Sequence, residues 1–410
     1  MSAAAADRHI VIVGAGHAGG RAAEALRAAG YKGPVTLIGE ERHPPYERPP
    51  LSKELLAGIM PIEKIYLRPQ ETYAELGIEL RLGARVAEIE RREQRLRLAE
   101  SGDIPYDALL LTTGARARRL PIPGGDGPRV LYLRDVEDAL RLRASLQPGL
   151  HLAVIGAGFI GLEVAATARK RGVAVTVLEL APHVLARVVP PEIGDFVAAL
   201  HRRNGVDLRT GVAVTAIEEA GDKVALRLQS GETVGADIVA IGVGAVPNCE
   251  LAAAAGLAVD DGVVVDEFGR SSDPAVFAAG DVTRHFNPLL GRSIRLEAWQ
   301  NAQNQGIAVA NVMAGSAEPF AEVPWFWTDQ YDMNLQTAGA PAAWDRLIWR
   351  GAPGDPGFTV FYLADGKPVA ATTVNNARDM RFARMLIARG KPVDAAALGD
   401  KAVKLQDLAR

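Results

Sequence analysis

The stretch His151-Leu-Ala-Val-Ile-Gly-Ala-Gly-Phe-Ile-Gly161 is the most informative part of this 410-residue chain. The apolar run that ends at Ile155 predicts a short buried strand, and the Gly-x-Gly-x-x-Gly spacing after it predicts a tight turn into a helix. In this motif the first glycine permits the turn, the second lets backbone approach a pyrophosphate, and the third lets the helix pack closely on the sheet. The free N–H groups at the start of that helix favour an anion.

The residues after Gly161 complete a dinucleotide-binding unit. Apolar helical positions continue as far as Gly172, which predicts the helix end, and residues 173–178 predict the next strand. That strand ends at Glu179, an acid at the spacing expected for a partner of a ribose hydroxyl. Because a carboxylate repels a 2′-phosphate and no arginine follows before Arg187, these residues favour NADH over NADPH.

The N-terminal stretch Ile10-Val-Ile-Val-Gly-Ala-Gly-His-Ala-Gly19 repeats the same pattern. An apolar helical stripe closes at Gly30, residues 35–38 predict the next strand, and Glu40 follows it. One match of this kind is also compatible with a Gly-rich strand-to-helix turn that binds nothing, whereas two matches with their acids in place are hard to explain in that way. The sequence therefore predicts an α/β protein with two Rossmann-like dinucleotide-binding domains.

Length and composition fit two or three soluble domains. The chain is 48% hydrophobic and 23% charged, and it contains no apolar run long enough to span a bilayer. Its net charge of −3 argues against general nucleic-acid binding, and residues 1–7 lack the basic and apolar blocks of a signal peptide. We therefore expect a cytoplasmic protein that binds neither nucleic acid nor membrane.

The single cysteine, Cys249, limits the chemistry. Pyridine-nucleotide disulfide reductases need a redox-active pair of cysteines, which one cysteine cannot form within a chain. One cysteine also cannot supply the usual four ligands of an iron–sulfur cluster, and we expect no metal site. Cys249 is better explained as a small packing residue than as a nucleophile.

A proline-rich loop, Arg42-His-Pro-Pro-Tyr-Glu-Arg-Pro-Pro-Leu-Ser-Lys53, follows the first nucleotide unit. Its prolines exclude regular structure before Leu51, after which a helix from Lys53 to Ala57 is expected to end at Gly58. The loop either positions the Lys53 charge at a helix start or is a stiff connector with a solvated lysine, and its own residues leave both interpretations open.

Further elements extend the two units. The strand within residues 106–114 ends on small residues suited to close approach of a ligand, and the Pro- and Gly-rich residues 115–128 predict a linker. A strand within residues 275–281 would place Asp281 at the carboxyl edge of a sheet, where ligands bind in open α/β folds, although Asp281 could also cap a turn. Residues 297–313 predict a helix whose first N–H groups suit an electron-rich ring.

The last quarter of the chain differs in character. Pro324-Trp-Phe-Trp-Thr-Asp-Gln-Tyr331 concentrates aromatic residues in a chain that is only 6% aromatic. Strands are predicted at 335–338, 346–349 and 358–363, followed by an Asp365-Gly366 hairpin turn, a return strand through Thr373, a helix at 379–389 and a charged tail. This pattern predicts a third domain of α+β type.

With these residues in view, the chain resembles, over essentially its whole length, the FAD-dependent, NADH-oxidising ferredoxin reductases of bacterial oxygenase systems. The proline–lysine and tryptophan motifs are specific to this family rather than to flavoproteins in general. Thr112 stands where alanine is commoner, and Trp299 stands where the family varies. The resemblance is carried by Gly14-Ala-Gly16, Arg48-Pro-Pro-Leu-Ser-Lys53, Leu133-Arg134, Gly161-Leu-Glu-Val-Ala-Ala-Thr167, Gly280-Asp281 and Pro324-Trp-Phe-Trp-Thr-Asp-Gln330.

The resemblance implies a glutathione-reductase-like flavoprotein with a discontinuous FAD-binding domain at 1–114 and 244–321, an NADH-binding domain at 115–243 and a C-terminal α+β domain at 322–410. Tightly bound FAD would use the first fingerprint and NADH the second. The implied FAD contacts are Gly14, Ala15, Gly16, His17, Ala18, Glu40, Lys53, Val86, Thr113, Gly114, Arg134, Gly280, Asp281, Glu297, Ala298 and Trp299. The implied NADH contacts are Gly156, Gly158, Phe159, Ile160, Glu179 and Gly242.

The same resemblance gives Lys53, Glu163 and Trp327 a part in the reaction. Glu163 would pair with Lys53 across the domain junction, and Trp327 would cover the flavin near the nicotinamide pocket. NADH would pass a hydride from nicotinamide C4 to flavin N5. Lys53 and the helix start at Trp299 would stabilise the anionic reduced flavin.

Single electrons would then pass to a small [2Fe–2S] ferredoxin. Because ferredoxins are commonly acidic, we expect docking on a basic patch of a monomeric or homodimeric reductase. The candidate residues are Arg116, Arg118, Arg119, Arg378, Arg381 and Arg384.

Two alternative functions are weaker. One is an NADH oxidase or quinone reductase, whose water-forming version needs a peroxidatic cysteine that this sequence lacks. The other is an NADH-binding signalling flavoprotein similar to the apoptosis-inducing factors, which carry targeting segments and basic nucleic-acid surfaces that this sequence does not show.

Overall fold

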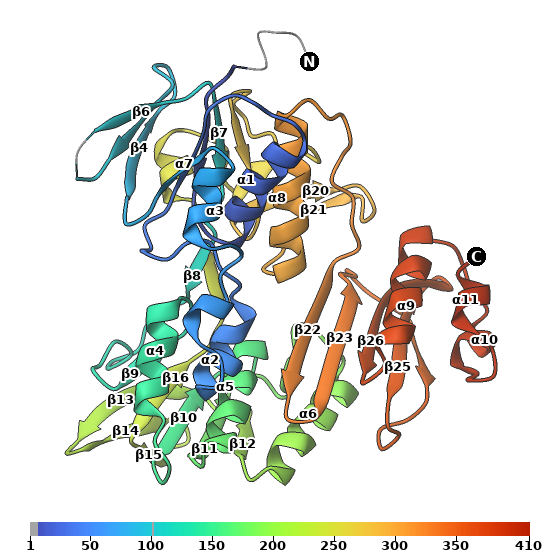
Figure 1. Ribbon diagram of the computed structural model, residues 1–410. Helices are drawn as coiled ribbons and strands as arrows, with labels where there is room; N and C mark the ends of the chain where they lie inside the picture. The colour runs from blue at the N-terminus through green and yellow to red at the C-terminus, as the bar shows by residue number, and fades with distance from the viewer. Residues whose placement is uncertain (1–6, 101) are drawn as a thin grey trace. The chain divides into compact units, whose positions relative to one another are not determined.

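The computed structural model describes residues 7–100 and 102–410, which form two compact units (Figure 1). The first unit contains the chain up to Arg48, Glu63–Arg116 and Val246–Phe326. The second contains Pro49–Ile62, Ala117–Ala245 and Trp327–Arg410. Each unit is built around one of the two Gly-rich fingerprints.

A five-stranded parallel sheet in the order β19-β7-β1-β2-β3 forms the centre of the first unit. Its strands are β1 (Ile10–Val13), β2 (Val35–Ile38), β3 (Ile78–Arg81), β7 (Ala108–Leu111) and β19 (Val276–Ala278). Every residue of β1 and β7 is buried, which agrees with their continuous apolar sequences, because strands covered on both faces do not alternate. Since β1 lies between β2 and β7, the turn after it leaves from the middle of the sheet.

Two helices lie side by side against this sheet, α1 (His17–Ala28) and α8 (Trp299–Met313) (Figure 1). Their approach is close: a Cβ atom added at Gly306 of α8 would stand 2.6 Å from the carbonyl oxygen of Ala18 in α1. The other elements of the unit are α3 (Gln70–Glu75), α7 (Glu250–Ala254), the sheet of β4 (Val86–Glu90), β5 (Arg95–Leu98) and β6 (Asp103–Pro105), and the sheet of β18 (Val263–Val265), β20 (Thr283–Asn287) and β21 (Arg292–Arg295).

The second unit repeats the parallel architecture in the order β12-β11-β10-β16-β9. These strands are β9 (Val130–Tyr132), β10 (His151–Ile155), β11 (Ala174–Glu179), β12 (Asp207–Thr210) and β16 (Ile238–Ile241). The accompanying elements are α4 (Val136–Ser145), α5 (Phe159–Lys170), α6 (Pro191–Arg203) and the antiparallel strands β13 (Val214–Ala220), β14 (Lys223–Leu228) and β15 (Thr233–Ala236). Here β10 has the central place that β1 has in the first unit.

An antiparallel C-terminal sheet shares one hydrophobic core with the helices of the second unit. Phe196 of α6 meets Phe358 edge to face, with ring centroids 5.3 Å apart, and buried Leu162 and Tyr362 belong to the same core. The sheet order is β22-β23-β26-β25-β24, from β22 (Trp325–Gln330), β23 (Met333–Gly339), β24 (Arg346–Arg350), β25 (Phe358–Ala364) and β26 (Lys367–Val374). The helices α9 (Ala377–Arg389), α10 (Ala395–Gly399) and α11 (Leu405–Leu408) follow. The expected hairpin turn is confirmed, because Asp365 and Gly366 both have positive φ, at 51° and 73°.

Several local predictions need correction. The prolines do not keep the loop irregular as far as Leu51, because a 3-10 helix, η2, already begins at Pro49 and runs to Ser52. Proline fits there because its fixed φ suits a helical turn. The charged tail contains two short helices, α10 and α11, whose Leu398 and Leu405 are buried. Residues 115–128 are not all linker, since β8 (Ala115–Ala117) is a short strand.

Candidate functional site

The first fingerprint turn combines two tightly packed glycines with one open glycine. Gly14 has φ +116°, and a Cβ atom there would lie 2.2 Å from the carbonyl oxygen of Thr112. A Cβ atom at Gly19 would lie 2.0 Å from the carbonyl oxygen of Gly14. At Gly16, in contrast, an added Cβ would meet none of the described atoms within 4 Å. Gly14 and Gly19 are therefore packed against protein backbone, whereas Gly16 is open, as close backbone contact with a pyrophosphate requires.

The start of α1 is free to bind an anion. Its N-cap, Gly16, makes no side-chain hydrogen bond to the described part of the helix, and no acid stands in the first turn. The first N–H groups of a helix without such a cap need another acceptor. Together with the open glycine, this observation shows that the first turn fits a dinucleotide phosphate.

His17 and Ala18 are enclosed by the packing of α8. The ring of His17 is 5.2 Å from that of Trp299, and a Cβ atom at Gly280 would be 2.9 Å from Cβ of Ala18. Burial, reinforced by nearby positive Arg21, lowers the pKa of His17 to about 3. His17 is consequently neutral near pH 7.

The loop before Asp281 is tied to α8 by a buried amide. The side-chain oxygen of Gln305 accepts a bond from the backbone N–H of Gly280 at 2.8 Å and one from the hydroxyl of Thr283 at 3.0 Å. Asp281 itself is half-buried. Of the three residues expected at the helix start, Glu297 lies before the helix, Ala298 is the N-cap and Trp299 is the first helical residue. The predicted start at Glu297 was therefore too early, and the backbone N–H group best placed at the terminus is that of Trp299.

The remaining residues expected at the first site lie in several environments. Thr113 exchanges hydrogen bonds with Asn248, at 2.7 Å from its hydroxyl and 2.9 Å to its carbonyl. Glu40 is exposed, and its carboxylate is 4.0 Å from Arg85. Ala15, Val86 and Gly114 are half-buried members of the same unit, whereas Arg134 belongs to the second unit, where its N–H donates to Asp138. The structure therefore brings together the glycine turn, Gly280 and Trp299 within the first unit.

The second fingerprint turn repeats this geometry. Gly156 has φ +100°, and its added Cβ would lie 2.5 Å from the carbonyl oxygen of Gly242. Gly242 therefore packs against the first glycine of this turn as Thr112 packs against Gly14. A Cβ at Gly161 would lie 2.1 Å from the carbonyl oxygen of Gly156, whereas one at Gly158 would meet nothing within 4 Å in the described chain. Phe159 is half-buried, and Ile160 is 45% exposed. This turn also fits a pyrophosphate.

Glu179 lies against the second turn. One carboxylate oxygen accepts the backbone N–H of Ala157 at 2.5 Å, and the other accepts that of Ala181 at 2.7 Å. The acid at the end of β11 therefore stands beside the glycines in space as well as in sequence pattern, and its two backbone bonds fix its orientation.

Lys53 and Glu163 form a shielded ion pair within the second unit. Lys53 Nζ is 2.9 Å from Glu163 Oε1, and the two side chains are 13% and 4% exposed. The Lys53 ammonium also lies 6.0 Å from the ring centre of Trp327. The sequence led us to expect this contact across a domain junction, but Pro49–Ile62, which carries Lys53, belongs to the same compact unit as Glu163. The loop therefore delivers its lysine to a fixed partner.

Sequence reasoning missed the other groups around Glu163. The hydroxyl of Ser52 donates to Glu163 at 2.5 Å, and the hydroxyl of Thr328 donates to its other oxygen at 2.6 Å. Thr328 stands in the tryptophan-rich motif that was singled out for its aromatic residues. The presence of three polar residues in that motif, Thr328, Asp329 and Gln330, was the available signal.

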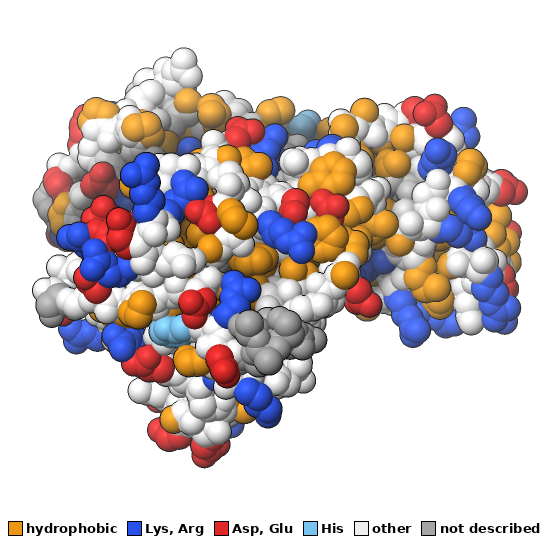
Figure 2. All heavy atoms as spheres, turned by 90° about the horizontal axis from the view of Figure 1, so that it is seen from above, with side chains coloured by type: hydrophobic (Ala, Val, Ile, Leu, Met, Phe, Trp, Pro, Cys, Tyr) orange, Lys and Arg blue, Asp and Glu red, His pale blue; other side chains and the backbone are white. Residues whose placement is uncertain are grey.

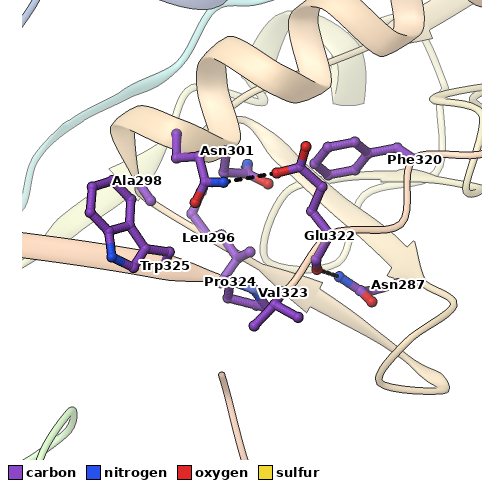
Figure 3. Close-up of a pocket in the computed structure, with 10 residues that line it drawn as sticks. Asn287, Leu296, Ala298, Asn301, Phe320, Glu322, Val323, Pro324 and Trp325 are labelled. Atoms are coloured by element: carbon purple, nitrogen blue, oxygen red, sulfur yellow. Dashed lines mark hydrogen bonds between the residues drawn. The ribbon is translucent and has the colours of Figure 1, made fainter. Parts of the chain in front are cut away.

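A small pocket of the first unit lies between the start of α8 and residues 320–325 (Figure 3). One of its lining residues is Glu322, whose carboxylate accepts hydrogen bonds from Gln300 at 3.0 Å and Asn304 at 2.7 Å. The backbone carbonyl of Glu322 accepts a bond from Asn287 at 2.9 Å. These hydrogen bonds join residues 320–325 to α8 and to β20.

Comparison with known proteins decides the family. Residues 8–306 match the family described as pyridine nucleotide-disulphide oxidoreductase, and residues 325–409 match the family described as reductase C-terminal. The chain belongs to the pyridine nucleotide-disulphide oxidoreductases.

Within this family the chain is similar, over nearly its full length, to reductases of oxygenase systems. It is 46% identical to the anthranilate 1,2-dioxygenase system ferredoxin–NAD(+) reductase component of Burkholderia cepacia, over 97% of this chain and 98% of that protein. It is 40% identical to putidaredoxin reductase of Pseudomonas putida, over 98% and 97% of the two chains. The crystal structure of a covalent putidaredoxin reductase–putidaredoxin complex matches with a TM-score of 0.95 at 41% identity, covering 98% of both chains. The predicted α/β fold with two dinucleotide-binding units and a C-terminal α+β part is thereby confirmed.

The chain has a single cysteine, so it cannot form the intrachain cysteine pair that disulfide reduction needs. Cys249 is half-buried and packs against apolar residues of the first unit. Burial, reinforced by Glu250, raises the pKa of its thiol, which opposes formation of a nucleophilic thiolate. Within residues 7–100 and 102–410, no group of three or more His, Cys, Asp or Glu side chains could hold a metal ion, and no helix is long and apolar enough to cross a membrane.

Proposed function

We propose that this chain is an FAD-dependent reductase that takes a hydride from NADH and passes single electrons to a [2Fe–2S] ferredoxin, which feeds a monooxygenase or a ring-hydroxylating dioxygenase. The observation that carries the proposal is the pair of open, uncapped glycine turns, one in each unit, in a chain with a single cysteine. Two dinucleotides and no thiol pair fit electron transfer from NADH through a flavin better than disulfide reduction. The similarity to ferredoxin–NAD(+) reductase components supports the same function.

The first turn is proposed to hold FAD tightly and the second to bind NADH. Gly14–Ala18 would face the FAD pyrophosphate, Glu40 the adenine-side ribose and Asp281 the ribityl chain. The second turn would present Gly156, Gly158, Phe159, Ile160 and Gly242 to NADH. We assign FAD binding to residues 1–114 and 244–321, NADH binding to 115–243, and the C-terminal α+β domain to 322–410.

Glu179 is proposed to select NADH over NADPH. Its carboxylate accepts ribose hydroxyl bonds and repels a 2′-phosphate, and its bonds to Ala157 and Ala181 hold it beside the turn.

When bound, FAD accepts a hydride and gives up electrons singly. The residues of this chain supply orientation and charge. Lys53 presents an ammonium held by Glu163, and the backbone N–H of Trp299 presents the positive end of α8; each favours negative charge in its own surroundings. Trp327 presents a flat apolar surface beside Lys53, suited to an aromatic ring.

We propose that the ferredoxin docks on arginines of α9. Arg378 and Arg381 are exposed and Arg384 is half-buried, and their spacing of three residues places them along one side of the helix. Arg116 and Arg119 instead pair with Glu250 and Asp126, which reduces the net charge that they offer. Figure 2 shows Lys and Arg side chains mixed with acidic ones over the face in view.

The direct test is NADH-driven cytochrome c reduction, with and without a bacterial [2Fe–2S] ferredoxin, at low and high salt. We expect the ferredoxin to accelerate the reaction strongly and high salt to reduce that acceleration. Arg381→Glu should raise the KM for ferredoxin by about fivefold, whereas Arg203→Glu, the same charge change at an exposed position of α6, should leave it within about twofold. If several ferredoxins have no effect while oxygen or a quinone consumes NADH rapidly, an NADH oxidase or quinone reductase replaces this proposal.

A further inference from the structure

A line of buried polar side chains extends from Glu163 of α5 through β22 to α6. Glu163 Oε1 accepts the hydroxyl of Thr328 at 2.6 Å, Thr328 Oγ1 accepts the side-chain amide N–H of Gln330 at 3.0 Å, and Gln330 Oε1 lies 2.7 Å from Nε2 of His201. Thr328 and His201 are 0% exposed and Gln330 is 1% exposed. Every member of this line belongs to the second compact unit.

The charge of Glu163 gives this line a single direction. A carboxylate oxygen only accepts, so the Thr328 hydroxyl must donate to it and has only lone pairs left for Gln330. The NH2 group of Gln330 must therefore face Thr328, and its carbonyl oxygen must face His201. That carbonyl needs a donor, which requires the proton of His201 to be on Nε2. Each hydrogen bond thus fixes the orientation of the next, from Glu163 to α6.

We propose that Thr328, Gln330 and His201 are positioning residues that hold the Glu163 carboxylate at Lys53, so that β22 and α6 set the place of the Lys53 ammonium. This inference rests on the proposed role of Lys53 at the flavin. Without Thr328, Oε1 of Glu163 would keep Lys53 as its partner and lose the hydroxyl that opposes its rotation.

Packing alone does not explain the line. Burying three polar side chains in a sheet–helix core gains little stability over apolar residues of the same size, whereas a hydrogen-bonded network fixes orientation. The same core contains ordinary apolar neighbours such as Phe358 and Val360, so apolar residues fit this core. The Glu163 end of the line is also anchored: Ser52 donates to the second oxygen of Glu163, and Thr167 donates to the carbonyl of Ser52 at 2.8 Å, which joins the Lys53 loop to α5.

The test compares Thr328→Val with Thr373→Val in the FAD-loaded protein. Thr373 of β26 is also 0% exposed, but its hydroxyl has no hydrogen-bond partner among the described residues. Thr373→Val therefore makes the same replacement of a buried hydroxyl by a methyl group without breaking a hydrogen bond of the line. The first measurement is the rate at which acetic anhydride modifies Lys53, read by peptide mass spectrometry. It needs neither NADH turnover nor ferredoxin.

We expect Thr328→Val to raise Lys53 modification by about threefold and to slow flavin reduction at saturating NADH by about tenfold, as expected for loss of a hydrogen bond to a charged group. The KM for NADH should stay within about twofold, because the binding turn is untouched. Thr328→Ser should restore both rates, and Thr373→Val should change neither. If Thr328→Val does not fold, Gln330→Met applies the same test one bond further away, with an expected change of about threefold.

An unchanged modification rate in the folded Thr328→Val or Gln330→Met variant, or an equal rise in Thr373→Val, would overturn the positioning role. Failure of the ferredoxin reductase function would look different, because wild-type protein would then reduce no ferredoxin while Lys53 modification still responded to Thr328→Val.

Discussion

The two glycine turns have the same backbone shape but different surroundings. In both, the first glycine has positive φ, the third is packed against the carbonyl of the first, and the second is open. In the first turn the next two residues are buried, with His17 7% and Ala18 6% exposed, because α8 packs on α1. In the second turn the corresponding Phe159 is half-buried and Ile160 is 45% exposed.

The acids after the two turns show the opposite contrast: the acid of the enclosed turn is exposed, and the acid of the open turn is held in place. The side chain of Glu40 is 75% exposed and lies 4.0 Å from Arg85, whereas Glu179 is fixed by two backbone N–H groups. An enclosed helix start suits a cofactor that stays bound, and an open helix start with a fixed acid suits a dinucleotide that must be selected and then released. This contrast supports FAD at the first turn and NADH at the second.

The largest effect should come from exchanging the open glycines for alanine. A methyl group at Gly16 or Gly158 meets no protein atom within 4 Å in the described structure, so each variant should fold and obstruct only the approach of a pyrophosphate. We expect Gly16→Ala to be purified with little FAD, and Gly158→Ala to keep its FAD and raise the KM for NADH about a hundredfold, or ~2.7 kcal/mol.

Flavin absorbance and steady-state kinetics distinguish the two variants. Gly14→Ala is the control for misfolding, since φ +116° and a carbonyl 2.2 Å from its Cβ should destabilise the whole unit by at least about 2 kcal/mol. Loss of FAD from Gly158→Ala with retention in Gly16→Ala would reverse the assignment of the two sites.

The second effect is acid sensitivity of the enclosed turn. Because burial lowers the pKa of His17 to about 3, the folded state does not take up a proton that the unfolded chain binds below about pH 6.5. His17 therefore leaves the free energy of unfolding unchanged above pH 6.5 and lowers it by about 2 kcal/mol at pH 5. His17→Phe, which copies Phe159 of the second turn, should remove this part of the loss.

Urea unfolding of both proteins at pH 5 and pH 8 checks this prediction. Some acid sensitivity will remain in the variant, because burial also lowers the pKa of His285 in the same unit to about 4. Equal losses of stability between pH 8 and pH 5 in wild type and His17→Phe would contradict it.

How far the sequence predicts this contrast depends on the range of the interactions. Both turns, their glycine roles and the position of Glu179 follow from local spacing, because strand, turn and helix are consecutive in the chain. The contact between Lys53 and Glu163 was expected from resemblance and is present at 2.9 Å. The enclosure of His17 was not predicted, since Trp299 is far from it in sequence and its helix could face either way.

The line from Glu163 to His201 could not be predicted for the same reason. Thr328 is 165 residues from Glu163, and Gln330 is 129 residues from His201, so their meeting depends on how the C-terminal sheet packs on α5 and α6. Short elements such as β15, α10 and α11 also escaped prediction, because a few residues stabilised by tertiary packing carry little periodic signal.

The third effect concerns the two acids. Glu179→Gln keeps a carbonyl oxygen for one backbone N–H and removes the charge. The KM for NADPH should therefore fall about threefold and the KM for NADH should rise about threefold, so that the ratio of the two KM values narrows about tenfold. Glu40→Gln, at the acid of the other turn, should leave the KM values for NADH and NADPH unchanged. Steady-state kinetics with both nucleotides, at one ionic strength, would contradict the selective role of Glu179 if the ratio stayed at its wild-type value.

The smallest effect is expected from replacing Cys249, which tests whether its thiol takes part in electron transfer. The side chain is half-buried against apolar residues, and burial raises the pKa of its thiol, so a nucleophilic thiolate is disfavoured near neutral pH. Cys249→Ala should cost at most about 1 kcal/mol of stability through lost packing and should leave NADH oxidation and ferredoxin reduction within about twofold of wild type. Pre-steady-state flavin reduction is the sharper readout, because a thiol that shared electrons with the flavin would add a kinetic phase and change the number of electrons taken up. If wild-type protein showed that phase and the variant lost it, or if the variant took up fewer electrons per flavin, two dinucleotides alone would not account for electron transfer. A thiol would then have to be part of the electron path.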